Sequence, residues 1–268
     1  TTASNNTAVG RASLQANTEG HSNAAVGMQS LNANTTGDLN TAVGYQALDT
    51  NTTADNNTAV GACALFTNTT GNDNTAIGID ALNGNTTAIG NTAVGKNALC
   101  KNTTGASNVS VGKNSIRCNT TGDSNVAVGC GALNKNTTAD NNTAVGQSAL
   151  LNNTTGAHNV AVGCGALTSN TTSGENTAVG FGALAAQTTG TPNDAFGNQT
   201  LCKLTTGSAN TGIGFRALCD ITTGVRNVSV GNSAGYKTTT GNENVAIGRA
   251  SNLSNTTGNN NVSVGTCA

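Results

Sequence analysis

The sequence repeats every 17 residues without a single insertion or deletion. When repeat position 1 is set at Asn6, Asn at position 1 and Gly at position 5 occur in every repeat. The repeat unit reads N-T-A-V-G-x-x-A-L-x-x-N-T-T-G-x-x. Its starts are Asn6, Asn23, Asn40, Asn57, Asn74, Asn91, Asn108, Asn125, Asn142, Asn159, Asn176, Asn193, Asn210, Asn227, Asn244 and Asn261. A pair of helices needs more than about thirty residues per repeat, whereas one coil of a β-solenoid fits this length.

The composition excludes most other fold classes. Of the 268 residues, 9% are charged and 2% are aromatic, and the chain has one Pro and no Trp. An ordinary globular domain is about one-quarter charged, and disordered chains are usually highly charged. A net charge of −1 gives no electrostatic reason to bind nucleic acid or a lipid surface. No apolar stretch approaches the ~18 residues of a membrane span.

The repeat predicts an all-β fold, a parallel β-solenoid or β-roll with one coil per 17 residues and about sixteen coils. Thr-Ala-Val favours a short strand, and the Gly after it permits a corner with positive φ. We expect a second short strand at positions 8 and 9, and a third strand or a turn at Asn-Thr-Thr-Gly. We also expect Val9, Val26, Val43 and their equivalents to stack inside the coils, ~4.8 Å apart.

Positions 3 and 8 are restricted to small residues. Position 3 is Ala, Ser or Gly, and position 8 is Ala or Ser except at Thr200. A solvent-facing position would vary toward Lys and Glu, so something approaches these residues closely. Two interpretations stay open, a narrow coil interior and a contact with another chain.

We treat residues 1–268 as a single repeat array without caps. Both ends fall in the middle of a repeat, and solenoids usually carry atypical terminal repeats that cover their open ends. We therefore expect a segment of a longer fibre, or a chain that stacks end to end on copies of itself.

The Asn-Thr-Thr segment also matches the N-glycosylation acceptor Asn-x-Ser/Thr. Two interpretations compete at position 12, a stacked ladder of hydrogen-bonded Asn amides and dense glycosylation. Position 12 changes to Gln187, Leu204, Ile221 and Thr238 in later repeats, which suggests partial burial. The candidate acceptors at position 12 are Asn34, Asn51, Asn68, Asn85, Asn102, Asn119, Asn136, Asn153, Asn170 and Asn255. Three more, Asn5, Asn56 and Asn141, lie near expected coil corners.

The repeat places some of the eight cysteines next to each other. Cys202 and Cys219 both occupy position 10 of adjacent repeats, so their Cα atoms should lie within disulfide range. Cys100 and Cys118 occupy positions 10 and 11 of adjacent repeats and form a second candidate pair. Surface cysteines in a polar rod suggest an oxidising, extracellular setting.

No catalytic, cofactor-binding or metal-binding motif is present. We find no Ser/His/Asp set, phosphate-binding Gly loop, CxxC pair or His/Cys cluster. We therefore expect neither an enzyme nor a protein that holds a cofactor or a metal.

The run from Asn40 to Leu48, Asn-Thr-Ala-Val-Gly-Tyr-Gln-Ala-Leu, and its variants resemble two groups of repeats. The first is the head repeat of YadA-like trimeric autotransporter adhesins, which build a left-handed parallel β-roll in a homotrimer. The second is the Asn-Thr-Ala-Val-Gly repeat of phage and bacterial fibre proteins. The resemblance covers essentially the whole chain and implies a fibrous, extracellular role. The adhesin period, however, is nearer fourteen.

Three functions fit these observations. The first is a structural extracellular fibre or surface appendage, possessing N-glycans if the acceptors are used. The second is the shaft of an adhesin or a viral tail fibre. The third is an ice-binding solenoid, because position 13 is Thr in every repeat. We expect localisation outside the cell or on a cell or virion surface, with copies of the chain, as a filament or a trimer, as the main partner.

Overall fold

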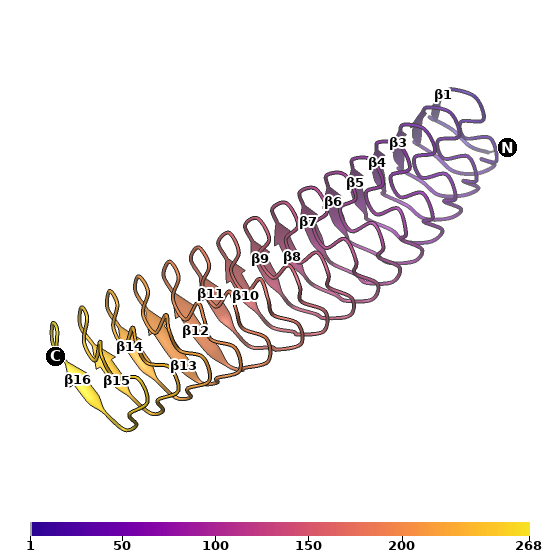
Figure 1. Cartoon of the computed structure of the whole chain (residues 1–268). Coiled ribbons are helices and arrows are strands. Elements are labelled where there is room, and N and C mark those ends of the chain that lie inside the picture. Colours follow the sequence, from indigo (N-terminus) through magenta and orange to yellow (C-terminus); the bar gives the residue numbers. More distant parts are fainter. Residues whose placement is uncertain (1) are drawn as a thin grey trace. The chain divides into compact units, whose positions relative to one another are not determined.

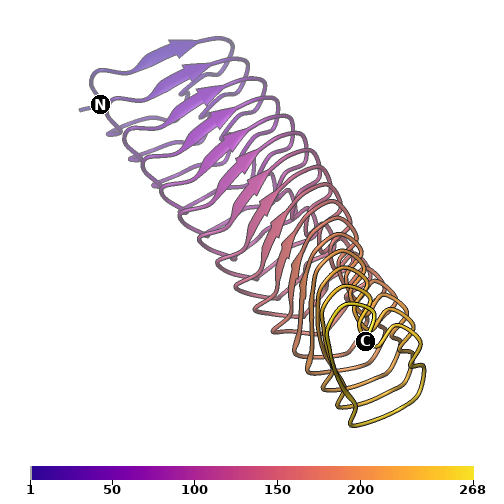
Figure 2. The same ribbon diagram turned by 90° about the vertical axis from the view of Figure 1, so that its left-hand side faces the viewer.

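The computed structural model describes residues 2–268, which form two units, residues 2–138 and residues 139–268. Each unit is a stack of β-coils, as the two views in Figures 1 and 2 show. The first unit contains β1 (Thr7–Val9), β2 (Ala24–Val26), β3 (Thr41–Val43), β4 (Thr58–Val60), β5 (Thr75–Ile77), β6 (Thr92–Val94), β7 (Val109–Val111) and β8 (Val126–Val128). The second contains β9 (Thr143–Val145), β10 (Val160–Val162), β11 (Thr177–Val179), β12 (Asn193–Phe196), β13 (Asn210–Ile213), β14 (Val228–Val230), β15 (Val245–Ile247) and β16 (Val262–Val264).

Neighbouring strands within each unit pair in parallel, shifted by one repeat. Ala42 of β3 pairs with Ala59 of β4, and Ala161 of β10 pairs with Ala178 of β11. Equivalent residues therefore stack directly on one another. This arrangement confirms the predicted all-β parallel solenoid with one coil per 17 residues, and residues 2–268 contain no helix.

Each coil contains one strand, so the predicted second strand at positions 8 and 9 is wrong. Those positions lie in a turn. In this turn the residues at repeat positions 7 and 9 have positive φ, for example Gln46 (φ 53) and Leu48 (φ 54). A left-handed conformation costs roughly 1–2 kcal/mol for a residue with a Cβ. Burial of a leucine side chain contributes about 1.5–3 kcal/mol. Leu48 is fully buried, so burial offsets the cost of the bend that turns the chain inward.

The core is made of alanine and leucine, and the prediction that Val9, Val26 and Val43 stack inside is wrong. Ala42 and Leu48 are 0% exposed, whereas Val43 is 38% exposed. Successive strand residues point to opposite faces, so with Ala at position 3 inside, positions 2 and 4 must face outward. A 17-residue coil leaves room for only a methyl group opposite the leucine.

The restriction of positions 3 and 8 to small residues therefore reflects a narrow interior. Ala42 and Ala47, at positions 3 and 8 of one coil, are both fully buried within the chain itself. Of the two interpretations left open by the sequence, the narrow interior is confirmed, and these positions are not a surface for another chain.

The Gly at position 5 makes the predicted corner and cannot be replaced without strain. Gly44 has φ 137, and a Cβ built on it would lie 2.6 Å from the carbonyl oxygen of Gly61 in the next coil. Both the backbone conformation and the close approach of the next coil exclude a side chain. Because the same contact recurs at each step, the Gly recurs in each repeat.

Candidate functional surfaces

Position 12 forms a buried ladder of Asn side chains. The Nδ2 of Asn51 donates to the Oδ1 of Asn34 in the preceding coil at 2.8 Å and to the carbonyl of Ala54 at 3.0 Å. The Nδ2 of Asn68 repeats this pattern with Asn51 at 3.0 Å and Gly71 at 3.0 Å. Both amide protons are thus used inside the fold, as the ladder interpretation predicted.

This ladder contradicts glycosylation at most position-12 acceptors. An N-glycan replaces one Nδ2 proton and needs open space beside the nitrogen, but these side chains are 0% exposed. The acceptors excluded on this ground are Asn34, Asn51, Asn68, Asn85, Asn102, Asn119, Asn136, Asn153 and Asn170. Asn255 is half-buried, and its Nδ2 donates to the carbonyl of Gly258 at 3.2 Å.

Position 1 contributes a second buried Asn column. The Oδ1 of Asn23 accepts the backbone N–H of Asn40 at 2.9 Å, and the Nδ2 of Asn40 donates to the carbonyl of Ala54 at 2.8 Å. That carbonyl also accepts from Asn51. The two columns therefore converge on one oxygen per coil and hold the Asn-Thr-Thr-Gly turn against the strand.

The remaining three acceptors lie on the surface. Asn5, Asn56 and Asn141 are exposed, at position 17, with φ 60, 59 and 58. Asn is among the few residues that tolerate this left-handed conformation. The predicted corner location is confirmed, and these three acceptors are accessible in the fold.

The ladder ends within the second unit. The Oδ1 of Asn170 is buried without a hydrogen-bond donor, because the next residue in the column, Gln187, directs its amide to Ser173 and Gly190. The next two residues of the column, Leu204 and Ile221, are apolar and fully buried, and buried Thr238 follows them. The replacement of amides by aliphatic side chains shows that burial, more than polarity, is required at this position.

The cysteines are free thiols in the structure. Cys202 and Cys219 lie on adjacent coils as expected, and the Sγ of Cys202 is 3.5 Å from the carbonyl oxygen of Cys219. A hydrogen bond from Cys219 lowers the pKa of the Cys202 thiol to about 7, and the same bond raises that of Cys219. The Cys202–Cys219 disulfide stays a prediction, as does a bond between half-buried Cys100 and Cys118.

The outward face of the strands carries an apolar stripe. Val and Ile at position 4 and larger side chains at position 6 flank the Gly corner and are exposed or half-buried. In the second unit this stripe includes three of the four phenylalanines. They are Phe181, Phe196 and Phe215, with exposures of 55%, 41% and 44%.

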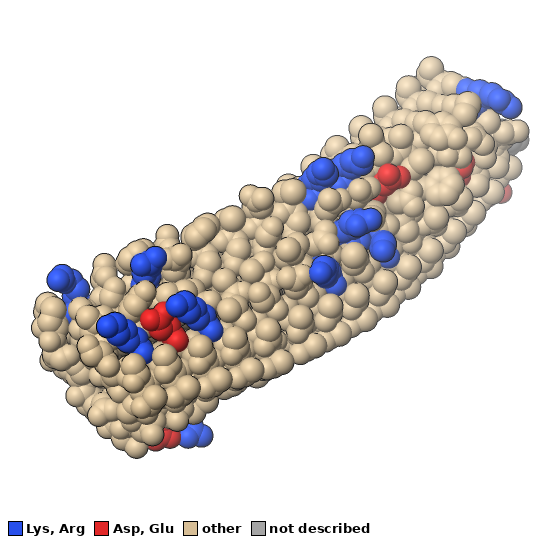
Figure 3. Space-filling model, in the orientation of Figure 1, with Lys and Arg blue, Asp and Glu red and all other residues tan. Residues whose placement is uncertain are grey.

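Basic side chains of the first unit are confined to one segment of the coil, in which Asp49 and Asp80 also lie. Positions 6–11 carry all of its Lys and Arg residues, whereas positions 14–17 carry acidic residues and no basic ones. The basic residues gather on the coils of β6–β8, visible in Figure 3. This restriction of the basic residues was not predicted above, but it can be read from the sequence once each charge is numbered by repeat position.

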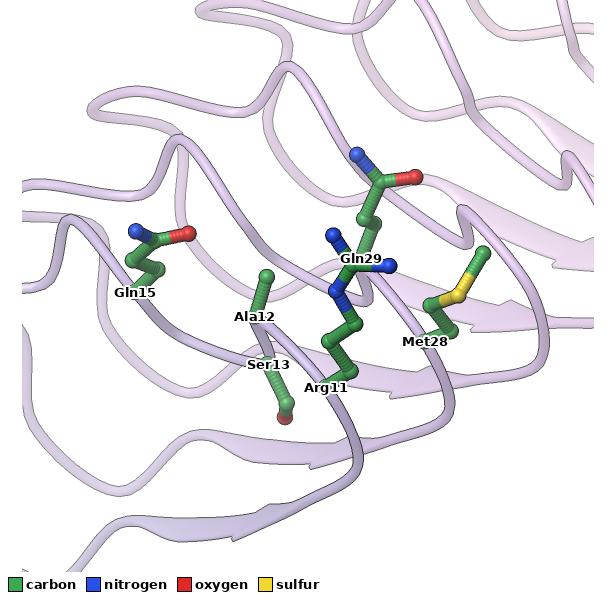
Figure 4. Close-up of a pocket in the computed structure, with 6 residues that line it drawn as sticks. All are labelled: Arg11, Ala12, Ser13, Gln15, Met28 and Gln29. Carbon is green, nitrogen blue, oxygen red and sulfur yellow. The ribbon is translucent and has the colours of Figure 1, made fainter.

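A hollow of about 580 Å³ lies on the first two coils. Figure 4 shows its lining side chains, which include Arg11, Gln15 and Gln29. A guanidinium and two amides can hydrogen-bond to a polar molecule, but they provide no acid–base pair. Within residues 2–268 no group of three or more His, Cys, Asp or Glu side chains is arranged for a metal, and no helix could cross a membrane.

Comparison with models of protein families, with curated proteins and with solved structures finds no match.

Proposed function

We propose that this chain is a structural protein of an extracellular fibre or surface appendage, and that copies of it assemble into filaments. The observation that carries this proposal is that adjacent coils bond to each other all around the coil in one repeating pattern. In the strand segment the N–H of Thr41 donates to the carbonyl of Asn57 at 2.8 Å. In the other two segments Leu48 donates to Ala64 at 2.9 Å and Thr52 donates to Thr69 at 3.1 Å.

Continuous hydrogen bonding between coils supports a structural role for the protein. The free energy of unfolding of a solenoid is approximately a sum over its repeats and their interfaces. Every added coil therefore lengthens the structure and increases this free energy by the same amount. The side chains inside the coil stabilise the stacking of the coils. Contacts with other molecules are made by side chains on the outer surface. The resemblance to fibre repeats and the accessible Asn acceptors support a location outside the cell.

Electron microscopy of the purified full chain tests this proposal. We expect filaments that have the width of a single solenoid. Their diffraction should show the ~4.8 Å spacing of coils stacked along the filament axis. Isolated particles of one chain over a range of protein concentrations and salt would contradict it.

Ice binding is a second candidate, supported by a different feature from the one seen in the sequence. The hydroxyl of Thr35 at position 13 donates to the carbonyl of Thr52 at 3.0 Å, so that column is engaged within the fold. On β3–β6, however, Thr at position 2 and Val or Ile at position 4 point outward in a regular array. Thermal hysteresis that Thr58→Lys abolishes would support this candidate, and its absence in the unaltered chain would remove it.

A further inference from the structure

We infer that copies of this chain associate side by side through two oppositely charged patches of the first unit. The inference rests on the proposed fibre and adds how fibres pair. The basic patch comprises Lys96, Lys101, Lys113, Arg117 and Lys135. The acidic patch comprises Glu19, Asp38, Asp55 and Asp73.

The basic patch is a compact set of cations, with Asp80 on the coil before it. Its five side chains are exposed and lie on three consecutive coils, at positions 6, 10 and 11. Positions 6–11 of those coils contain no Asp or Glu. The ion pairs Lys203–Asp220 and Arg226–Glu243 belong to the second unit.

The acidic patch lies on a different segment of the coil and on earlier coils. Glu19 and Asp73 are exposed, and Asp38 and Asp55 are half-buried. The Oδ1 of Asp38 accepts the backbone N–H of His21 at 2.6 Å, and that of Asp55 accepts the N–H of Asp38 at 2.7 Å. These backbone bonds fix the carboxylates at the surface, and positions 12–17 of the first unit carry no Lys or Arg to neutralise them.

The partner that fits is a second copy of the same chain. The basic patch spans three coils and the acidic patch spans four, and the spacing between coils is the same in both. The five cations of one copy can therefore face the four carboxylates of another. The four carboxylates lie on the coils of β1–β4, and the cations lie on the coils of β6–β8. A parallel neighbour that brings these two patches together is shifted by about four coils, roughly 19 Å at the stacking distance of a β-ladder. Asp123 and Asp140, at position 16 of the coils of β7 and β8, lie outside this shifted contact.

This contact would be open-ended. A patch on one segment meets a different patch on the neighbour, which leaves each copy with one free patch of each sign. Each exposed ion pair contributes little to association on its own, so pairing should depend on many copies held along a fibre. It should also be strong at about 0.01 M salt and weak at about 1 M, where the screening length falls from roughly 30 Å to 3 Å.

Charge reversal of two residues per patch tests the inference. Variant A is Lys113→Glu with Lys135→Glu, and variant B is Glu19→Lys with Asp73→Lys. The matched control is Lys237→Glu with Arg249→Glu, which reverses two cations of the second unit at the same repeat positions, 11 and 6. Circular dichroism verifies that each variant folds.

We expect the unaltered chain and the control to form bundled fibres at low salt, with light scattering that falls to the single-fibre level at high salt. Variants A and B, each alone, should scatter at the single-fibre level at low salt. Their mixture should recover bundling, since the acidic patch of A is intact and so is the basic patch of B.

The outcomes separate this inference from the proposed function. Single fibres of the unaltered chain whose width and scattering do not respond to salt, or bundles that persist in variants A and B, would overturn the pairing and leave the fibre intact. A complete lack of fibres would contradict the proposed function. Bundling lost equally in the control would show that net charge alone is responsible and would also overturn the inference.

Discussion

At the scale of single residues, neighbouring positions of one strand have opposite environments. Ala127 of β8 is fully buried, and Val128 beside it is 38% exposed. The larger and more apolar side chain is outside, because the coil is too narrow to admit it. Hydrophobicity alone therefore does not identify the core of this protein.

This contrast gives the first prediction. Ala127→Asp should destabilise the first unit by more than about 3 kcal/mol, because it buries an unpaired charge in a space that held a methyl group. Val128→Asp should cost at most about 1 kcal/mol, the range of strand propensities, since the carboxylate points to water. Denaturant unfolding of the two variants measures this difference, and equal losses would contradict the assignment of the faces.

A second residue-scale prediction concerns glycans. In a host with an N-glycosylation pathway, the modified acceptors should be exposed Asn56 and Asn141 and not buried Asn51 or Asn136. Asn56→Gln with Asn141→Gln should lower the mass that a glycosidase releases by the share of these two sites. Intact mass and glycopeptide mapping measure this, with Asn51→Gln as the control that should leave glycan mass unchanged. Glycans on folded chains at Asn51 would show that the ladder is not formed.

At the scale of elements, the strand and its corner could be predicted from the repeat, and the turn could not. Thr-Ala-Val followed by Gly marks the strand by β propensity and by the need for positive φ. Nothing in Ala-Leu signals that Leu48 adopts φ 54, since leucine rarely does so. The burial that stabilises this conformation comes from adjacent coils, and a local pattern does not contain it.

Some features of the candidate surfaces could likewise be predicted from the sequence, and others could not. The change of position 12 from Asn to Leu204 and Ile221 already indicated a buried column, and the ladder confirms it. The orientation of the strand was not predictable, because Thr, Val and Ala occur on either face of a sheet. That orientation depends on coil width, which follows from the turn geometry.

The third prediction belongs to the adjacent turns of Cys202 and Cys219. The pKa of Cys202 is lowered to about 7 by the hydrogen bond from Cys219, so its thiolate should be abundant at pH 8 and scarce at pH 6. Burial raises the pKa of Cys63 and of Cys100 above that of an ordinary thiol. Cys202 should therefore be alkylated faster than either one at pH 8, with this advantage lost as the pH falls below 7.

Mild oxidation completes this test. We expect a disulfide between Cys202 and Cys219, found by peptide mapping without reduction, and its formation should abolish alkylation of Cys202. Cys219→Ser keeps a weak donor but removes the disulfide partner, so it separates reactivity from cross-linking. Alkylation of Cys202 no faster than that of Cys63 would show that the two thiols do not interact.

At the scale of the whole molecule, length should be adjustable only in units of one repeat. Deletion of residues 75–91, a complete 17-residue repeat within the first unit, joins Asn74 to Thr92 and restores the unit sequence without a break. Each residue then stacks on the same repeat position as before, so Ala59 meets Ala93 in the way it met Ala76. Stability should fall only by the share of one repeat and its interface.

Deletion of residues 75–90, one residue fewer, is the matched control. It puts a coil of 18 residues in the stack, because Asn74 is then followed by a second Asn and every later residue of that coil is displaced by one. In a strand, a shift by one residue exchanges the inward and outward faces, which would turn Asn or Thr toward the core and Ala toward water. We expect the 17-residue deletion to retain the β circular dichroism spectrum and a cooperative thermal transition, and the 16-residue deletion to lose cooperativity or to bulge out the extra residue with a lower transition temperature. Equal stability of the two deletions would mean that the coils are held together by composition alone and not by the register of the columns.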